Sequence, residues 1–294
     1  MKGRLPARCR RSLGATALVG LLWASGAGAG PSALPRVQHV MLVVLENADY
    51  DTARAQPFLA RLAREGALLR QSFAVAHPSQ PNYLALTAGT THGVDSNTPV
   101  TLDIPHVGDL LEVEGRAWKV YAEGYPGQCF LGPRSGAYVR RHVPFLSFKS
   151  VQGHPARCAR IVDATELAAD IRDGTLPDYA LYVPDVRHDG HDTGVRAADE
   201  WLSETFGPLL RDPRLTESMV FMVTFDEGRR GWWGRNRVYT VVYGDRVIPG
   251  SVSDTRYDHY SLLRTIEELL GLGTLGQEDA KASPITGVWK VHPD

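Results

Sequence analysis

The sequence lacks several features that define common protein classes. Its formal net charge is only −1 over 294 residues, and 43% of the residues are hydrophobic, which excludes a disordered tail protein. The missing basic excess argues against a nucleic-acid-binding protein. The 29 glycines and 19 prolines are spread along the chain and exclude a coiled coil. No run of about 20 apolar residues is present, so we expect no membrane-spanning helix in the mature chain.

The first 29 residues have the composition of an export signal. Five basic residues at positions 2–11 precede a short apolar run at 13–24, and the small residues at 25–30 offer a cleavage site. A short N-terminal helix and an uncleaved signal anchor are alternatives, and the Arg10-Arg11 pair permits twin-arginine as well as Sec export. Cleavage would leave residues 30–294 with a net charge of −6, because five basic residues and no carboxylate are removed. We expect an exported protein, either periplasmic or secreted.

Only three cysteines are present, and Cys9 would leave with the signal. In an oxidising compartment Cys129 and Cys158 are expected to form a disulfide. It would close a loop of about 30 residues and contribute roughly 3–4 kcal/mol in the chain-entropy model. The alternative is two unpaired buried thiols, and two cysteines alone cannot form a zinc knuckle.

Strand-like and helix-like segments alternate after residue 30, without an internal repeat or a low-complexity linker. Apolar runs predict strands at residues 37–45, 67–76, 118–121, 179–183, 219–225 and 238–243. Helical spacing predicts helices at residues 57–65, 81–88, 165–172, 197–210 and 261–270. This alternation predicts a single α/β domain over residues 30–294, with a mainly parallel central sheet flanked by helices on both faces.

Polar residues follow several of these predicted strands, and they are Glu46, Asn47, Ser79, Asp185, Asp226 and Glu227. In open α/β sheets ligands bind outside the carboxyl ends of the strands, so we expect these side chains to meet at one edge. Loops are polar in general, and that alone would explain one or two such positions. It explains poorly two adjacent pairs of polar residues that directly follow long buried strands.

The oxygen donors in this set suit Mg²⁺, Ca²⁺ or Mn²⁺, and crowded carboxylates without a cation would be costly to bury. Ser79 lies where a predicted strand gives way to a helix. Its hydroxyl can face the metal, which would activate it as a nucleophile, while the helix N-terminus offers backbone N–H groups to an anion. Ser79 as an ordinary helix N-cap is the alternative interpretation.

Residues 185–194, DVRHDGHDTG, form the densest polar cluster of the chain and are candidates for a second metal site or a phosphate site. A calcium loop of EF-hand type is excluded, because Arg187 and Arg196 fall at its third and twelfth ligand positions. A solvated polar loop remains an alternative. His259, directly before the last predicted helix, is a further candidate ligand or general acid, or a structural histidine. His142 lies in a basic stretch that can meet phosphate or form a surface turn.

Six motifs together resemble one family. They are LENADY (45–50), HPSQPNY (77–83), LPDY (176–179), DGHDTG (189–194), TFDEG (224–228) and YDHYSLLRTI (257–266). In this order they resemble the phosphoesterase family of acid phosphatases and non-specific phospholipases C, within the alkaline-phosphatase-like superfamily. The chain is similar to the compact secreted acid phosphatases of that family. The resemblance implies an alkaline-phosphatase-like fold and a phosphoric-ester hydrolase.

The resemblance also implies roles for individual residues. A divalent metal ion, whether Mg²⁺, Ca²⁺, Mn²⁺ or Zn²⁺, would be bound by Glu46, Asn47, Ser79, Asp226 and Glu227. Ser79 would also be the nucleophile that is phosphorylated during the reaction, where phospholipase C relatives have a threonine. The leaving group would be protonated by His191 or His259.

The residues of a second metal or phosphate site would be Asp185, His188, Asp189 and His142. The spacing from Asp185 to His191 departs from the superfamily pattern, so one metal ion and two both remain open. We therefore expect an exported phosphomonoesterase of acid-phosphatase type, with phosphoinositides among its candidate substrates and no nucleic-acid partner. The alternatives are a phospholipase C or phosphodiesterase of the same family and, more remotely, a non-catalytic metal- or anion-binding protein.

Overall fold

The computed structural model describes residues 34–229 and 236–291, together with Met1 and Gly3. Apart from those two residues, the predicted export segment lies outside the described part of the chain, and so does Cys9. The described residues from Leu34 onward belong to one compact unit. The start of a mature domain at residue 30 stays a prediction.

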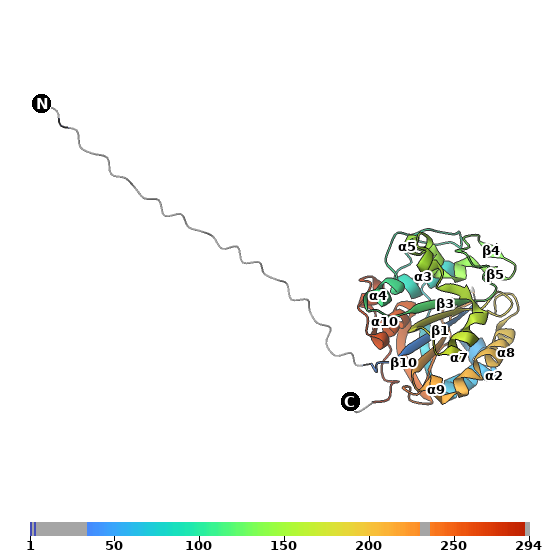
Figure 1. Ribbon diagram of the computed structural model, residues 1–294. Coiled ribbons are helices and arrows are strands. Elements are labelled where there is room, and N and C mark those ends of the chain that lie inside the picture. Colours follow the sequence, from blue (N-terminus) through green and yellow to red (C-terminus); the bar gives the residue numbers. More distant parts are fainter. Residues whose placement is uncertain (2, 4–33, 230–235, 292–294) are drawn as a thin grey trace. The chain divides into compact units, whose positions relative to one another are not determined.

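A central sheet organises this unit (Figure 1). Its strand order is β10-β2-β9-β8-β1-β7-β3-β6. The strands are β1 (His39–Leu45), β2 (Ala67–Phe73), β3 (Trp118–Ala122), β6 (Ile161–Asp163), β7 (Tyr179–Val183), β8 (Met219–Phe225), β9 (Thr240–Tyr243) and β10 (Ser251–Asp258). Strand β9 is antiparallel to both of its neighbours, and all other pairs are parallel. The predicted mainly parallel sheet is therefore confirmed. A separate short hairpin joins β4 (Arg134–Ser135) to β5 (Tyr138–Val139).

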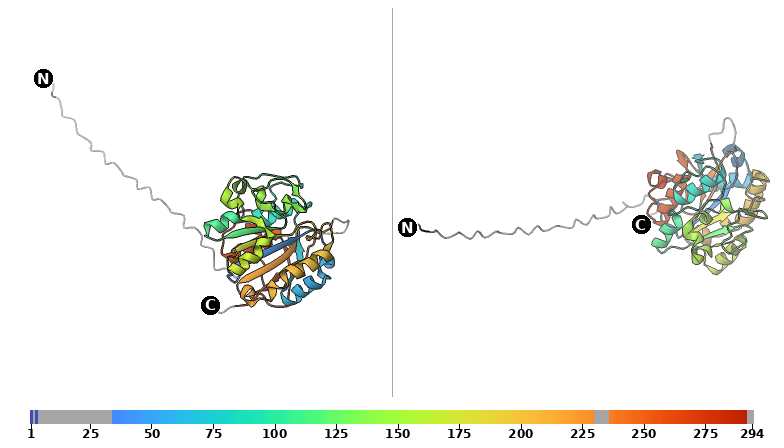
Figure 2. Two further views of the ribbon diagram at one scale, coloured as in Figure 1. Left: turned by 45° about the vertical axis from the view of Figure 1, so that its right-hand side comes forward. Right: turned by 90° about the horizontal axis from the view of Figure 1, so that it is seen from above.

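Helices cover both faces of the sheet, as predicted (Figure 2). The longer ones are α2 (Pro57–Glu65), α3 (Ser79–Ala88), α4 (Val107–Val113), α7 (Leu167–Asp173), α8 (Val195–Phe206) and α10 (His259–Leu270). Short helices are α1 (Tyr50–Arg54), α5 (Lys149–Gln152), α6 (Pro155–Cys158), α9 (Pro213–Thr216) and α11 (Glu278–Lys281). The 3-10 turns are η1 (Arg140–His142), η2 (Pro144–Ser147), η3 (Ala164–Glu166) and η4 (Leu209–Arg211).

Alternate residues of each buried strand enter two separate cores, because side chains of a strand point to opposite faces. On β1, Leu42 packs into the core that contains α3, α4 and α10. The next residue, Val43, packs into the core that contains α2 and α8. A strand buried on both faces reads as a continuous apolar run, which is why the sequence revealed it.

Several predicted boundaries need correction. Helix α3 begins at Ser79, two residues before the predicted start, and β2 ends at Phe73, three residues before the predicted end. Strands β6 and β10 were not predicted at all. Strand β6 has only three residues, and β10 lies at the sheet edge with half of its residues exposed, so neither shows an apolar run.

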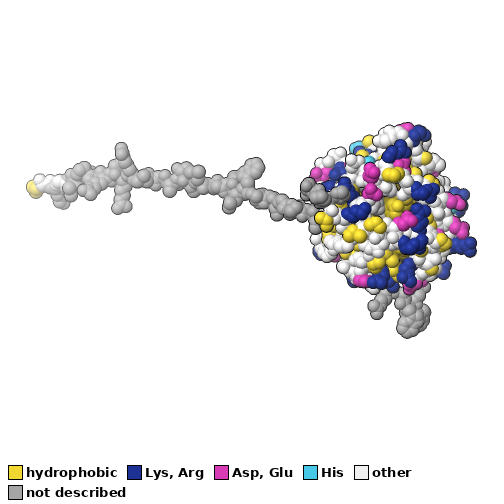
Figure 3. Space-filling model, turned by 90° about the horizontal axis from the view of Figure 1, so that it is seen from below, with side chains coloured by type: hydrophobic (Ala, Val, Ile, Leu, Met, Phe, Trp, Pro, Cys, Tyr) yellow, Lys and Arg dark blue, Asp and Glu magenta, His cyan; other side chains and the backbone are white. Residues whose placement is uncertain are grey.

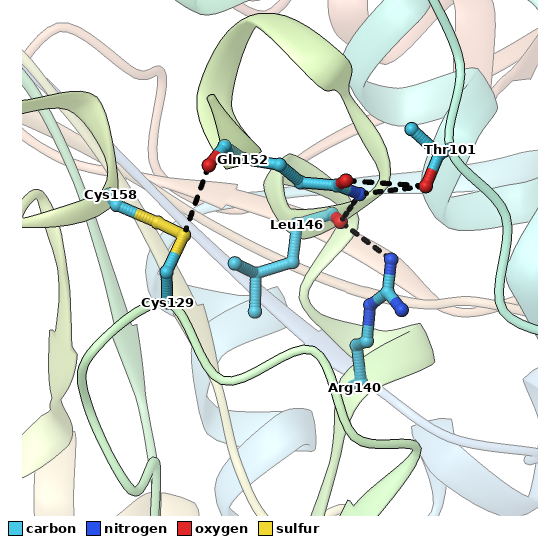
Figure 4. Close-up of a disulfide and its surroundings, with 6 residues drawn as sticks. All are labelled: Thr101, Cys129, Arg140, Leu146, Gln152 and Cys158. Atoms are coloured by element: carbon cyan, nitrogen blue, oxygen red, sulfur yellow. Dashed lines mark hydrogen bonds between the residues drawn. A yellow bond between two sulfur atoms is a disulfide. The ribbon is translucent and has the colours of Figure 1, made fainter. Parts of the chain in front are cut away.

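The predicted disulfide between Cys129 and Cys158 is confirmed, with Cα atoms 5.4 Å apart. It ties the loop after β3 to α6 (Figure 4). Beside it, the Gln152 amide donates to the Leu146 carbonyl at 2.7 Å and to the Thr101 hydroxyl at 3.1 Å. The disulfide and the hydrogen bonds of the Gln152 side chain therefore stabilise the same region.

On the face shown in Figure 3, basic, acidic and hydrophobic side chains are interspersed, without a patch of one charge. Among the described residues, no helix has the length and apolar character that crossing a membrane requires.

Candidate active site

The carboxyl ends of β1 and β8 place the first site residues side by side. Leu45 and Phe225 are register partners, so Glu46 and Asp226 leave the sheet next to each other. The backbone N–H of Asp226 donates to the Leu45 carbonyl at 2.8 Å. The N–H of Glu46 donates to the carbonyl of Asp189 at the same distance, which brings a distant loop to this edge.

The five predicted metal ligands form one connected cluster. The Ser79 hydroxyl lies 3.1 Å from Oε2 of Glu46 and 3.4 Å from Oε1 of Glu227. The Asn47 backbone N–H donates to Oδ1 of Asp226 at 3.1 Å, and its side-chain amide donates to Glu46 at 3.2 Å. Asn47 has a φ of 53°, a left-handed conformation that asparagine tolerates better than most residues. Five of the six residues expected to meet at the strand ends therefore do so, and Asp185 does not join them.

Ser79 is the first residue of α3 and is 2% exposed. Pro78 occupies the N-cap position, so the interpretation of Ser79 as an ordinary N-cap is wrong. The hydroxyl of Ser79 faces carboxylates instead of capping the helix. The backbone N–H of Gln80 donates to the Asn97 side chain at 3.0 Å, so this amide at the helix start already has an acceptor.

The carboxylates of the cluster are buried close together, and this raises their pKa values. Burial is the largest cause for Glu46, whose pKa lies well above its usual range, and the charges of Asp226 and Asp189 add to it. Burial also raises the pKa of Asp226 to about 7 and that of Asp189 to about 8. Oδ2 of Asp226 is buried, and no residue in the described part of the chain donates a hydrogen bond to it. Repelling carboxylates with a free oxygen fit a bound divalent cation, which would offset their charge.

His142 and Asp189, two of the four second-site candidates, join the same cluster. Nε2 of His142 lies 3.2 Å from Oε1 of Glu46, and Nδ1 lies 3.6 Å from Oδ2 of Asp189. The imidazole stacks on the Tyr83 ring with centroids 5.3 Å apart. Burial, followed by the positive charge of Arg141, lowers the pKa of His142 well below its usual range. A neutral His142 is therefore expected between two acidic groups.

Asp185 and His188, the other two candidates, meet Glu123 instead. Their ligand-type atoms and those of Glu123 lie within 4.8 Å of one another, so this trio is a second candidate metal group. Nδ1 of His188 is 2.8 Å from Glu123 and 3.8 Å from Asp185. The guanidinium of Arg187 donates to both oxygens of Asp185, so an internal cation already offsets this carboxylate.

The two candidate general acids have different surroundings. His259 is the first residue of α10, is 1% exposed, and has Nε2 2.6 Å from the backbone carbonyl of Asp226. A carbonyl only accepts, so Nε2 donates, and burial lowers the pKa of this histidine. His191 is 42% exposed, and its Nδ1 lies 2.7 Å from the Asp192 carboxylate. Only His191 combines solvent access with a carboxylate partner, which favours it over His259 as a proton donor.

Three residues of these clusters were not predicted. Tyr83 donates its hydroxyl to Oε1 of Glu46 at 2.7 Å, and His77 contacts Oε2 of Glu227 through Nδ1. Glu123 directly follows β3, so the rule that identified Glu46 would also have found it. Tyr83 lies four residues after Ser79, one turn along the same helix face, and that spacing was a usable signal.

The chain is similar to known phosphoesterases. The model of the phosphoesterase family matches residues 49–273. A phosphatidylinositol-3-phosphatase of Mycobacterium tuberculosis is 34% identical over 283 residues, which cover 92% of this chain and 91% of that protein. An acid phosphatase of Aspergillus niger is 35% identical over 81% of this chain, and a phosphate-repressible acid phosphatase of Penicillium chrysogenum is 33% identical over 81%. The chain spans about 60% of the length of these two fungal relatives.

Among solved structures, a protein of the alkaline phosphatase superfamily from Vibrio parahaemolyticus has a TM-score of 0.60. The match has 13% sequence identity and covers 87% of this chain and 72% of that one. The murine ectonucleotide pyrophosphatase/phosphodiesterase 5 has a TM-score of 0.56 at 11% identity, with 82% and 97% coverage. At this identity the likeness shows a shared fold, which agrees with the predicted fold class.

Proposed function

The chain belongs to the phosphoesterase family, and from that premise we propose that it is a metal-dependent phosphomonoesterase working through a phosphoserine intermediate. One observation carries the proposal. The hydroxyl of Ser79, at the start of α3, lies within 3.4 Å of carboxylate oxygens of both Glu46 and Glu227. A serine needs such activation, because its hydroxyl is a weak nucleophile at neutral pH.

The cation would be held by the strand-end cluster, that is by Glu46, Asn47, Ser79, Asp226 and Glu227. When bound, a divalent metal ion supplies charge stabilisation at the phosphoryl oxygens and lowers the pKa of the serine hydroxyl. Tyr83 orients Glu46 through its hydroxyl, and His77 orients Glu227 through Nδ1. The trio of Glu123, Asp185 and His188, of which only Asp185 is buried, is a second candidate site, so one or two cations are compatible with the proposal.

The chain's own residues then move the protons. The Ser79 hydroxyl gives its proton to a neighbouring carboxylate as its oxygen forms a bond to phosphorus. The bond from phosphorus to the leaving oxygen breaks, and His191 donates a proton to that oxygen. The Asp192 carboxylate lies 2.7 Å from Nδ1 of His191 and orients the ring. In the second half, water attacks phosphorus and gives a proton to His191. The bond from phosphorus to the Ser79 oxygen breaks, the neighbouring carboxylate returns its proton to that oxygen, and phosphate leaves.

The substrate class follows from the relatives. The mycobacterial relative, matched over nearly its full length, is a phosphatidylinositol-3-phosphatase, and the fungal ones are acid phosphatases. We therefore propose small phosphomonoesters and phosphoinositide headgroups as substrates. Phosphodiesters and phospholipids are the alternative substrates within the family. Export to the periplasm or the medium, with residues 1–29 as the signal and 30–294 as the catalytic domain, rests on the N-terminal sequence.

A substrate panel on Ser79→Ala and the unchanged protein tests this function. p-Nitrophenyl phosphate, its bis ester, phosphatidylinositol 3-phosphate and phosphatidylcholine are compared before chelation, after chelation and after metal add-back. We expect monoester turnover that chelator removes and metal restores, and none from Ser79→Ala although it still binds metal. Normal turnover by Ser79→Ala would contradict the nucleophile assignment. Faster diester turnover would favour the phosphodiesterase, and metal binding without any turnover would favour a binding protein.

A further inference from the structure

Two adjacent arginines on η1 have opposite environments. Arg140 is 6% exposed and donates to three backbone carbonyls, those of Leu131 at 2.9 Å, Val100 at 3.0 Å and Leu146 at 2.8 Å. Figure 4 shows its guanidinium directed at the Leu146 carbonyl, inside the region that the disulfide closes. These three bonds join separate loops, so Arg140 fixes the position of η1.

Arg141 has no comparable role. Its Nε is buried, and none of the described residues accepts a hydrogen bond from it. Within residues 34–229 and 236–291, no carboxylate lies within ion-pair distance of its guanidinium. A buried N–H group without an acceptor costs roughly 1–3 kcal/mol, so such a position is unfavourable unless an acceptor arrives.

The place of Arg141 identifies that acceptor. The next residue, His142, contacts Glu46, and η1 packs against α3, the helix that begins with Ser79. The charge of Arg141 acts on both Glu46 and His142, which puts it beside the strand-end cluster. A cation held next to acidic groups and paired with none of them is available to an anionic ligand.

We propose that Arg141 binds the phosphoryl group of the substrate, with its guanidinium fork on two non-bridging oxygens while Ser79 faces the phosphorus. A planar guanidinium matches two phosphoryl oxygens, and a lysine ammonium cannot reproduce that geometry. This assignment rests on the proposed function. It makes Arg141 a specificity residue, because a monoester has three non-bridging oxygens to share between the fork and the metal cluster, and a diester has only two.

Binding of inorganic phosphate to the metal-loaded full chain tests the assignment without turnover. Isothermal titration compares the unchanged protein with Arg141→Gln, Arg141→Lys and Ser79→Ala. The matched control is Arg134→Gln, which removes an exposed arginine whose Nε donates to the nearby Gly136 carbonyl. We expect Arg141→Gln to bind phosphate roughly 10- to 100-fold more weakly, the loss of hydrogen bonds to a charged group. The phosphate affinity of Arg141→Lys should lie between that of the unchanged protein and that of Arg141→Gln. Arg134→Gln should bind phosphate as tightly as the unchanged protein.

The kinetic readout separates binding from a merely structural role. We expect Arg141→Gln to lose more kcat/KM with p-nitrophenyl phosphate than with its bis ester, at an unchanged thermal midpoint. Phosphate affinity equal to that of the unchanged protein in Arg141→Gln would overturn the assignment. If that variant does not fold, Arg141→Lys decides: weaker phosphate binding supports the assignment, and full affinity overturns it. Turnover by Ser79→Ala would refute the proposed function alone and leave this binding test intact.

Discussion

A buried carboxyl far from the strand-end cluster gives the sharpest prediction on stability. Glu267 on α10 is fully buried, and no described residue donates a hydrogen bond to either of its carboxyl oxygens. The nearest cation is Arg264, 3.7 Å away, and it lies closer to Glu268 at 2.8 Å. Burial, then the neighbouring carboxyl of Asp279, raises the pKa of Glu267 from 4.5 to about 9. The folded protein therefore keeps this proton at pH values where the unfolded chain has lost it.

The sign and size of the effect follow from proton linkage. Between pH 4.5 and about 9 folding takes up one proton at Glu267, so this residue's contribution to stability falls as pH rises. The slope is about 1.4 kcal/mol per pH unit. Glu267→Gln removes the titration. When the pH is raised from 5.5 to 7.5, the free energy of unfolding of the variant should therefore rise by about 2.7 kcal/mol relative to that of the unchanged protein. That corresponds to a relative rise of about 5–10 °C in the thermal midpoint.

Urea unfolding followed by tryptophan fluorescence, at constant saturating metal, measures this difference at each pH. Both proteins have the same strand-end cluster, so its titration cancels when the free energy of unfolding of one is subtracted from that of the other. The control is Glu200→Gln, which makes the same substitution at an exposed carboxylate paired with Arg196 and is measured at the same pH values. A pH-independent difference for Glu267→Gln would show that this carboxyl is ionised in the folded protein and would refute the reasoning.

Three further predictions concern single contacts. Tyr83→Phe removes one hydrogen bond to Glu46 and should lower kcat roughly tenfold. It should also weaken metal binding in a chelator titration. If kcat and metal affinity are both unchanged, Tyr83 does not position Glu46. Reduction of the bond between Cys129 and Cys158, or Cys129→Ser, should cost about 3–4 kcal/mol in urea unfolding, and an unchanged midpoint would argue against its contribution. Asp199→Ala removes the carboxylate that accepts both backbone N–H groups at the start of α2, so it should cost about 1–2 kcal/mol at unchanged kcat.

Local sequence patterns predicted the buried elements well. The bounds expected for α2, β7 and β8 agree with the structure, because each is an apolar or amphipathic segment with clear ends. The edge strand β10 escaped, because half of its residues are exposed and it carries no apolar run. Strand β9 was found, but its antiparallel direction was not, since strand direction depends on the connections and not on the residues themselves.

The sequence predicted that acidic residues and a serine would meet at one sheet edge. Buried strands are recognisable as apolar runs, and parallel strands bring their carboxyl ends together, so Glu46, Ser79, Asp185 and Asp226 were all expected there. Which residues join Glu46 depends on the strand order and on contacts between loops, and these exist only in the folded chain. Asp189 does so through its backbone bond to Glu46, whereas Asp185, four residues earlier, turns to Glu123.

The same holds for the histidines and arginines around the site. His191 and His259 carry the same chemistry in sequence, but one faces solvent and the other donates to a backbone carbonyl. Arg140 and Arg141 are adjacent, but one holds three loops together and the other has a buried nitrogen without a partner. These differences arise from contacts between segments distant in sequence, and local propensity carries no information about such contacts.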